Sequence, residues 1–198
     1  MPVDVDDPRA VALRGLLDAD LDERYRDADR DDPPDFAEKR AAALAVHREQ
    51  IVATLLAIDA DGTPLGHVML RRLDGEWELK RLIVSAGARR RGVGRALTER
   101  VVQIAHESGA ARVILQSGRM QPESLVLYAA TGFPPIPVYE PYIETMPRSL
   151  CFERVLPSAG PTAAAAPAAG AAPTAAGHNA GDSGPTARPA AQHARGQQ

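Results

Sequence analysis

Apolar residues near the start of the chain recur at the spacing of an α-helix with one buried face. This pattern covers residues 8–23 and consists of Val11, Leu13, Leu16, Leu17 and Leu21. An Ala-rich segment, residues 35–48, is predicted to form a second helix with Asp35 as its N-cap. Helical spacing returns in residues 92–107, where the predicted apolar face consists of Val93, Leu97, Val101, Ile104 and Ala105. Residues 122–131 are predicted to form a fourth helix, with Pro122 in its first turn.

Other segments have the short apolar runs that are typical of β-strands. Residues 50–73 contain two such runs on either side of Asp61-Gly62, which is a strong hairpin signal. Further strands are predicted over residues 75–85, 111–117 and 149–156, with a short edge strand over residues 3–5. This order predicts an α/β (α+β) domain with a mixed, mostly antiparallel central sheet flanked by helices. One parallel connection is expected to run through residues 92–107.

The last 42 residues differ in composition from the rest of the chain. Residues 157–198 consist mainly of Ala, Pro, Gly and Thr, and Pro and Gly interrupt every Ala run. Such a segment has almost no large apolar side chain to bury, so it is predicted to be disordered. The folded domain is therefore expected to span residues 1–156.

Charge and composition narrow the functional classes. The net charge is -3, which argues against a globally basic nucleic-acid-binding protein. The single cysteine, Cys151, excludes an internal disulfide, and the five histidines show no metal-ligand spacing, so no metal site is predicted. The N-terminal segment is acidic where a secretory signal would be basic, and we find no apolar run of roughly 18 residues. A cytoplasmic protein without membrane contact is expected.

The stretch "VSAGARRRGVGRAL", residues 84–97, contains four arginines and three glycines, and two of these glycines, Gly92 and Gly94, lie at a predicted helix start. The first N–H groups of a helix have no partner inside the helix, and the helix dipole adds positive charge there. Glycine lets a phosphate approach the backbone, and arginine side chains can close over its oxygens. The sequence therefore predicts an anion site, for which a basic surface loop is the simpler alternative. Val93-Gly94 stands where a P-loop needs Lys-Ser or Lys-Thr, and Leu97 stands where a dinucleotide fingerprint needs Gly or Ala.

The motif "RRRGVG", residues 89–94, instead resembles the pyrophosphate loop of the GNAT superfamily of N-acetyltransferases. One predicted strand downstream, "QPESLVLYAATGFPPI" resembles the closing motif of that superfamily, with a short helix, Leu-Tyr and Gly-Phe. The longer run to "SLCFERVL" is similar to a group of small bacterial single-domain GNAT proteins. Gln121 stands where many members have Asn.

The resemblance implies an acetyl-CoA-dependent N-acetyltransferase that transfers an acetyl group to a primary amine by direct attack in a ternary complex. It implies Tyr128 as the acid for the leaving thiolate and Glu78 as the base, with Glu76 as an alternative. The backbone of Leu82, Ile83 and Val84 would bind the pantetheine arm. The other expected cofactor-binding residues are Arg89, Arg90, Arg91, Gly92, Val93, Gly94, Arg95 and Gln121.

Several alternatives remain open in the sequence. Tyr128 can be a packed core tyrosine, and Glu78 can be a strand-end carboxylate paired with Lys80 or Arg81. The whole domain can be a non-catalytic acyl-CoA-binding module. The acceptor can be a small molecule or a protein amino group. Acidic residues around Asp18–Asp35, together with Tyr139, Glu140, Tyr142 and Glu144, favour a cationic amine. Homodimers are common in the superfamily.

Overall fold

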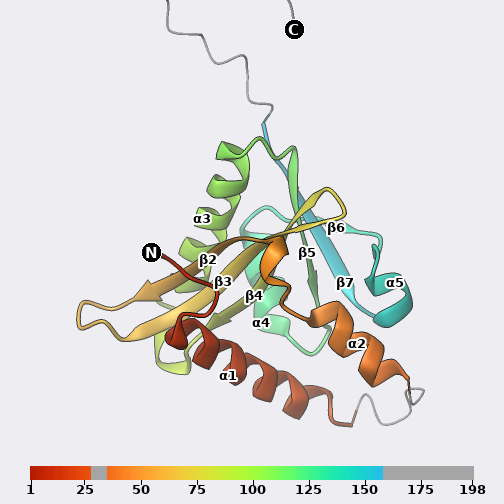
Figure 1. Cartoon of the computed structure of the whole chain (residues 1–198), viewed down its shortest axis with the longest axis horizontal. Helices are drawn as coiled ribbons and strands as arrows, with labels where there is room; N and C mark the ends of the chain where they lie inside the picture. The colour runs from red at the N-terminus through yellow and green to blue at the C-terminus, as the bar shows by residue number, and fades with distance from the viewer. Residues whose placement is uncertain (28–34, 158–198) are drawn as a thin grey trace, which may run out of the picture. The chain divides into compact units, whose positions relative to one another are not determined.

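The computed structural model describes residues 1–27 and 35–157, which form helices on both sides of one β-sheet (Figure 1). The strands are β1 (Pro2–Val3), β2 (Ile51–Ile58), β3 (Pro64–Leu73), β4 (Glu76–Val84), β5 (Arg112–Ser117), β6 (Pro135–Ile136) and β7 (Leu150–Val155). The α-helices are α1 (Pro8–Tyr25), α2 (Phe36–Leu44), α3 (Val93–Glu107), α4 (Pro122–Ala130) and α5 (Tyr142–Thr145). Two single-turn 3₁₀ helices cover Arg48–Gln50 and Ala86–Ala88.

The sheet confirms the predicted fold class. Its strand order is β1-β2-β3-β4-β5-β7-β6, and all neighbours are antiparallel except β4 and β5. The parallel pair is connected through α3, as the helix pattern of residues 92–107 predicts. The hairpin around Asp61-Gly62 is present, with Gly62 at a φ of +88° that a glycine adopts readily.

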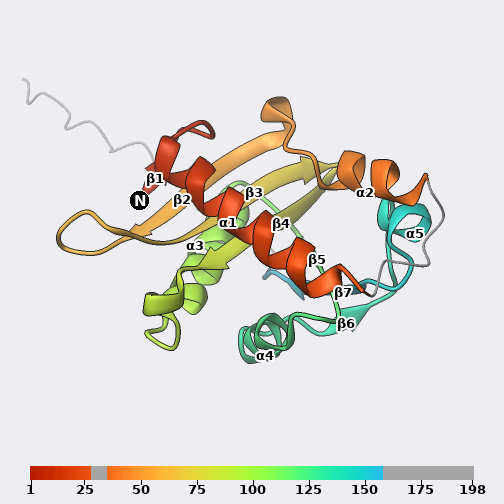
Figure 2. The same ribbon diagram turned by 90° about the horizontal axis from the view of Figure 1, so that it is seen from below.

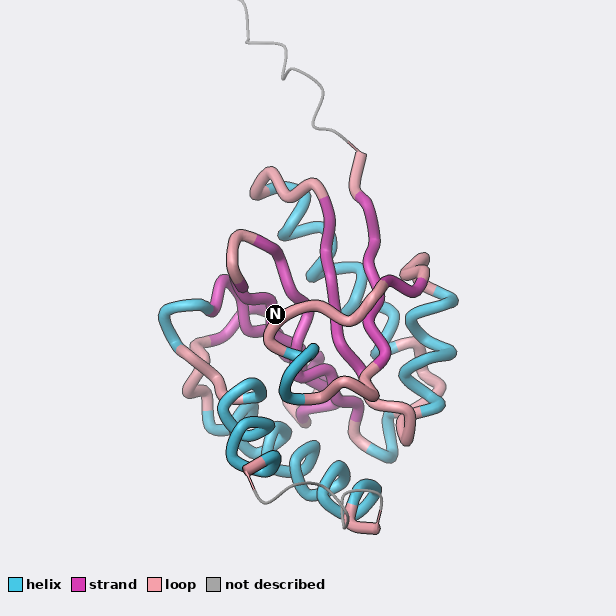
Figure 3. The backbone as a smooth tube through the Cα atoms, turned by 90° about the vertical axis from the view of Figure 1, so that its right-hand side faces the viewer, coloured by secondary structure: helices cyan, strands magenta, loops and turns pink. Residues whose placement is uncertain are grey.

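The two faces of the sheet are covered by different helices. α1 and α2 lie on one face, and α3 and α4 lie on the other (Figure 2). In a view along a perpendicular direction, helices again flank the strands on both sides (Figure 3). Because side chains alternate along a strand, neighbouring residues such as Glu78 and Leu79 serve opposite faces.

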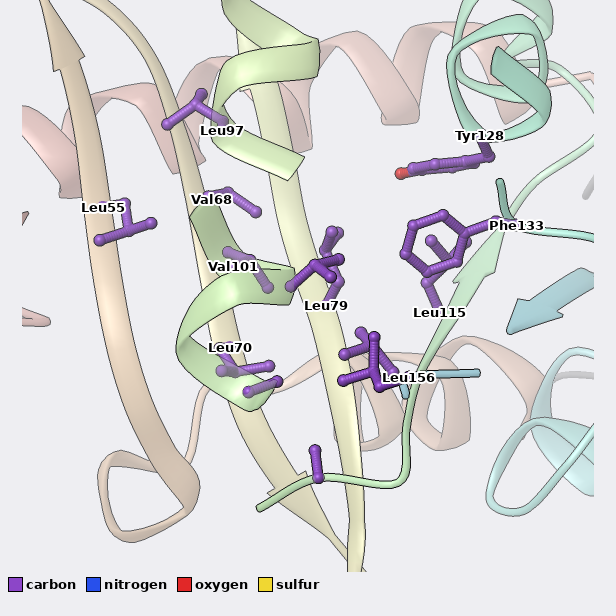
Figure 4. Close-up of a cluster of buried hydrophobic side chains, with 14 residues drawn as sticks. Leu55, Val68, Leu70, Leu79, Leu97, Val101, Leu115, Tyr128, Phe133 and Leu156 are labelled. Atoms are coloured by element: carbon purple, nitrogen blue, oxygen red, sulfur yellow. The ribbon is translucent and has the colours of Figure 1, made fainter. Parts of the chain in front are cut away.

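The main hydrophobic core lies between the sheet and α3 (Figure 4). Leu97, Val101 and Ala105 of α3 are buried there, while Val93 and Ile104 pack against its edge. The predicted apolar face of this helix is therefore confirmed. Gly66 of β3 allows α3 to lie close to the sheet, because a Cβ there would stand 3.1 Å from Leu97 and 2.8 Å from the Ile83 carbonyl oxygen.

The first two helices differ in detail from the sequence prediction. α1 buries Ala10, Leu13 and Leu17, whereas Val11 and Leu16 are 46% and 61% exposed. The predicted apolar pattern omits alanine, and Ala10 completes the buried face with Leu13 and Leu17.

α2 ends at Leu44 rather than at residue 48. The carbonyl oxygens of Ala43 and Leu44 accept hydrogen bonds from Lys80 and Arg81 of β4. These tertiary partners satisfy the last carbonyls of the helix. Asp35 is at the N-cap position but pairs with Lys39 at 2.7 Å and makes no capping bond.

Other differences lie in short elements and chain ends. β1 pairs at Pro2–Val3 rather than over residues 3–5. β6, α5 and the 3₁₀ helices were not predicted, because they are only two to four residues long and lie in segments with weak periodicity. The predicted disordered tail lies outside the described residues except for Pro157. None of the helices in residues 1–27 and 35–157 combines the length and apolarity needed to cross a membrane.

Candidate active site

The arginine-glycine stretch forms the turn between β4 and α3. Gly92 is the N-cap of α3 with a φ of +81° and a ψ of 0°, a left-handed conformation that favours glycine. The Ala96 N–H donates to the Gly92 carbonyl, which starts the helical ladder, so the N–H groups of residues 93–95 have no partner within the helix. A Cβ at Gly92 would meet no atom within 4 Å. The turn therefore has the open, N–H-rich geometry that an anion site requires.

The arginines of this turn are exposed, and two of them already hold the turn in place. Arg91 forms an ion pair with Asp59 at 3.2 Å, and Arg95 donates to the Ala130 carbonyl at 3.1 Å. Arg89 and Arg90 are exposed on the turn itself, with Arg90 at a φ of +60°. Exposed guanidinium groups beside a helix N-terminus fit a polyphosphate.

Next to this turn, the parallel strands β4 and β5 separate from each other. Their register consists of Glu78 opposite Ile114 and Leu79 opposite Leu115, yet β4 continues to Val84 and β5 to Ser117. Beyond the last pair, the edge of β4 that faces β5 includes Leu82, Ile83 and Val84. An unpaired strand edge offers its backbone to an extended ligand, in the manner of an added strand. The structure thus brings the predicted pantetheine-binding strand and the arginine turn together at one gap.

Gly94 and Gln121 border the same region. A Cβ at Gly94 would lie 3.1 Å from Leu127 of α4 and 3.5 Å from Val84, so glycine lets α3 and α4 approach each other. Gln121 is the N-cap residue of α4, and its backbone N–H donates to the Gly118 carbonyl.

Tyr128 extends from α4 into the main core with only 5% of its surface exposed. Its ring packs against Phe133 and Phe152, with centroid distances of 6.1 and 5.9 Å. Figure 4 shows the hydroxyl group turned away from Phe133, toward the strand that carries Leu79. Burial raises the pKa of Tyr128 above its usual value, so the hydroxyl group stays protonated near neutral pH.

Glu78 lies on the opposite face of the sheet, where its side chain is 1% exposed. Arg71 of β3 donates to Oε2 at 2.5 Å, and the hydroxyl groups of Tyr139 and Tyr142 donate to Oε1 at 2.9 and 2.7 Å. The carboxylate is therefore paired with Arg71 rather than with Lys80 or Arg81, the partners considered from the sequence. These three partners were missed because they are 7, 61 and 64 residues away along the chain. Glu76, the alternative base, instead forms an ion pair with Arg112 at 2.6 Å.

Lys80 completes this buried polar cluster. Its Nζ donates to the Ala43 carbonyl at 2.8 Å and to the Tyr142 hydroxyl at 2.9 Å. Burial is the main reason why the pKa of Lys80 falls to about 7. The sequence signal for this burial is weak, since a lysine in an apolar strand is compatible with an exposed edge position as well.

A cavity of about 450 Å³ lies on the α1 and α2 side of the sheet, and Leu44, which follows the Lys80 partner Ala43, is among its lining residues. Its walls come from α1, α2, the end of β5, the 118–121 loop and residues 145–149. The lining includes acidic and basic groups, among them Asp18, Asp22, Arg26 and Arg119. Asp18 pairs with Arg81, and Tyr139 and Tyr142 turn inward toward Glu78, so the acidic acceptor side expected from the sequence forms only part of a mixed lining. Residues 28–34 of the acidic stretch lie outside the described residues.

Comparison with known proteins identifies the family to which the chain belongs. Residues 13–133, more than half of the chain, match the model of the acetyltransferase (GNAT) family. The chain therefore belongs to the GNAT acetyltransferase family.

Two solved structures share the fold. A Klebsiella pneumoniae protein assigned as an acyl-CoA N-acyltransferase is 19% identical, with a TM-score of 0.62, over 79% of this chain and 95% of that chain. A Staphylococcus aureus acetyltransferase of the GNAT family is 21% identical, with a TM-score of 0.56, over 79% of this chain and 99% of that chain.

Among curated proteins, the chain is similar to mouse N-acetyltransferase 8, with 36% identity over 84 residues. The match covers 42% of this chain and 34% of the mouse protein. Human N-acetyltransferase 8 is 31% identical over 90 residues, which is 46% of this chain and 37% of that protein. The chain thus aligns with about a third of the length of these relatives.

Proposed function

We propose that the protein is an acetyl-CoA-dependent N-acetyltransferase that acts on a primary amine by direct attack in a ternary complex. The observation that carries this proposal is the gap between β4 and β5, with the arginine turn beside it. Family membership and the N-acetyltransferase relatives support the same activity. The acceptor class, small molecule or protein amino group, is left open by this geometry.

The turn and the strand edge supply the proposed acetyl-CoA site. The N–H groups at the start of α3 and the side chains of Arg89, Arg90, Arg91 and Arg95 would hold the pyrophosphate. The backbone of Leu82, Ile83 and Val84 would bind the pantetheine arm, and Gln121 would contribute a polar contact from α4. With this arrangement, the thioester would lie where β4 and β5 separate.

The proposed acid and base approach the thioester from opposite faces of the sheet. Tyr128 would donate a proton or a hydrogen bond to the leaving sulfur from the α4 side. Glu78 would support removal of a proton from the acceptor amine on the α1 and α2 side. An amine with a pKa near 10 is mostly protonated at pH 7, so transfer requires such a base. The cavity lined by α1, α2 and the 118–121 loop would provide room for the acceptor.

The decisive experiment compares two isosteric variants at Gly92 by calorimetric titration of acetyl-CoA into the full chain. Asn tolerates the left-handed conformation, and a Cβ fits at this position, so Gly92→Asn is the matched control for Gly92→Asp. We expect Gly92→Asp to lose at least about tenfold in affinity relative to Gly92→Asn, because its carboxylate repels the pyrophosphate. Equal affinities would contradict the proposed site.

Turnover separates an enzyme from a non-catalytic acyl-CoA-binding module. The full chain is incubated with acetyl-CoA and a panel of primary alkylamines, aralkylamines and lysine-containing peptides, and thiol release is followed. Amide formation on one or more of these amines is expected. Tight binding of acetyl-CoA without any amide product would favour the binding module instead.

A further inference from the structure

Glu78 has no open route to a bound amine. Its Oε1 accepts from Tyr139 and Tyr142, its Oε2 accepts from Arg71, and its side chain is 1% exposed. A proton removed from an amine in the cavity therefore needs an entry group that lies between the cavity and this carboxylate.

Lys80 lies closer to the cavity than Glu78, two residues further along β4, and its partner Ala43 precedes Leu44, which lines the cavity. It follows Leu79, the last residue of β4 that pairs with β5, and its side chain lies on the same face of the sheet as Glu78. Its Nζ contacts Ala43 at the end of α2 and Tyr142 at the start of α5. Residues further along both segments line the cavity, namely Leu44 after Ala43, and Thr145 and Met146 after Tyr142.

The hydrogen bonds around Tyr142 determine that Lys80 donates to the tyrosine hydroxyl group rather than accepting from it. Arg71 Nη2 donates to the Tyr142 hydroxyl oxygen at 3.2 Å and Lys80 Nζ donates to it at 2.9 Å, while the hydroxyl group itself donates to Glu78. Its one donor and two acceptor positions are thus filled. A neutral Lys80 amine has two N–H groups, which donate to the Ala43 carbonyl and the Tyr142 hydroxyl oxygen. Its one lone pair is then left to accept a proton.

The charges around Lys80 come from several elements. Burial lowers its pKa to about 7, Glu78 opposes this shift, and Arg71 of β3 and Arg81 of β4 add to it. Arg81 is itself paired with Asp18 of α1.

The remaining titratable neighbours of this cluster stay neutral near pH 7. Burial raises the pKa values of Tyr139 and Tyr142, and it raises the pKa of Cys151 of β7 to about 11. α2 presents the Ala43 carbonyl to the lysine. Among these groups, Lys80 is the one whose proton occupancy changes near neutrality.

We propose that Lys80 is the catalytic base that takes a proton from the acceptor ammonium, and that Glu78 stabilises the resulting lysine ammonium. This inference rests on the proposed acetyl transfer. The acceptor R–NH₃⁺ gives one proton to the Nζ lone pair, and the nitrogen of R–NH₂ then forms the amide bond as the carbon–sulfur bond breaks. The second amine proton ends on the leaving sulfur, and the first is released from Lys80 to solvent after the products leave.

The test uses Lys80→Met and Lys80→Arg in the full chain, with the alkylamine from the panel that is acetylated fastest and its β,β-difluoro analogue. Fluorination leaves the shape similar but lowers the ammonium pKa to about 7, so a large fraction of this substrate is already neutral and its reaction depends much less on a base. Both variants are expected to lose at least about 100-fold in kcat/KM for the alkylamine and less than about tenfold for the analogue. Lys80→Arg keeps the positive charge but cannot accept a proton, so substantial rescue by arginine would overturn the proposal, as would equal losses for the two amines.

Two further measurements distinguish a lost base from a lost fold or a lost acetyl-CoA site. Calorimetric titration of acetyl-CoA into each variant shows whether the fold and the acetyl-CoA site survive the substitution. NMR of the lysine side chains, with the Lys80 signal assigned from its absence in Lys80→Met, follows its titration without any acceptor. Titration near pH 7 is expected, and an ammonium that persists to pH 9 would overturn the role of Lys80 even if the protein is an active acetyltransferase. Absence of amide formation with every amine would instead count against the proposed function.

Discussion

The two faces of the sheet bury different chemistry. The face under α3 and α4 carries mostly apolar side chains, such as Val68, Leu79 and Leu115 (Figure 4). The face under α1 and α2 also buries five polar or charged residues from the strands, namely Thr54, His67, Arg71, Glu78 and Lys80. Strand alternation lets one sheet bury apolar side chains on one face and a hydrogen-bonded cluster of charged side chains on the other.

This difference has energetic consequences. Apolar burial stabilises a protein at about 25 cal/mol per Å² and depends little on pH. Buried charges need partners, and their balance changes with protonation. The polar face is therefore expected to respond strongly to loss of a charged partner and to acid, whereas the apolar face is not.

The largest expected effect comes from breaking the buried ion pair. Arg71→Met would leave Glu78 buried without its cation, so the free energy of unfolding should fall by about 3–5 kcal/mol. Urea unfolding at pH 7 measures this loss. The control is Arg112→Met, which removes pairs to Glu76 and Glu153 from a side chain that is 42% exposed. It should change stability by about 1 kcal/mol or less, and equal losses in the two variants would show that the polar face has no special dependence on charge.

A smaller effect is expected from acid acting on His67. This side chain is fully buried, and burial lowers its pKa to about 4 from an ordinary value of 6.5. The unfolded chain therefore takes up the proton first as the pH falls. The stability contributed by neutral His67 is complete above pH 6.5 and is lost between pH 6.5 and 4, by at most about 3 kcal/mol at 1.36 kcal/mol per pKa unit.

The His67→Leu variant isolates this contribution. Urea unfolding of both proteins at several pH values between 7 and 4 gives the two slopes, and carboxylates that also titrate in this range affect both equally. The natural chain should lose more stability than the variant over this interval. Parallel slopes would mean that His67 does not titrate differently in the folded and unfolded states.

The smallest effect on stability is expected from Tyr128→Phe on the apolar face. The ring contacts with Phe133 and Phe152 remain, so the free energy of unfolding should change by less than about 1 kcal/mol. In contrast, kcat should fall by about 100-fold, because the proposed acid is removed. Thermal unfolding and steady-state acetylation of the same sample check both statements. An unchanged kcat would leave Tyr128 as a core residue alone.

The sequence predicts best those features that depend on neighbouring residues. The apolar face of α3 repeats every three or four positions, and the hairpin at Asp61-Gly62 follows from turn chemistry. The left-handed turn at Gly92 is also local, because glycine favours that conformation. The arginine turn lies at the start of α3, and Asp59 of the hairpin pairs with Arg91, so the candidate anion site depends on elements that the sequence predicts well.

Features that depend on distant partners could not be predicted in this way. The end of α2 is set by Lys80 and Arg81, which are 37 residues from the carbonyl groups that they bind. The environment of Glu78 depends on Tyr139 and Tyr142, from a Pro-rich segment without clear periodicity. Glutamate on a strand predicts a polar position, but its burial and its cluster of partners follow only from tertiary packing.

The parting of β4 and β5 also divides the sheet into two antiparallel blocks, β1-β2-β3-β4 and β5-β7-β6. Two residue pairs of register join these blocks within the sheet, and α3 bridges them from one side. A ligand that fills the gap would crosslink the blocks without a covalent bond. Because such a ligand binds the folded state alone, the melting temperature becomes a function of its concentration. If acetyl-CoA is this ligand, the stability of the fold would rise with the supply of the protein's own substrate.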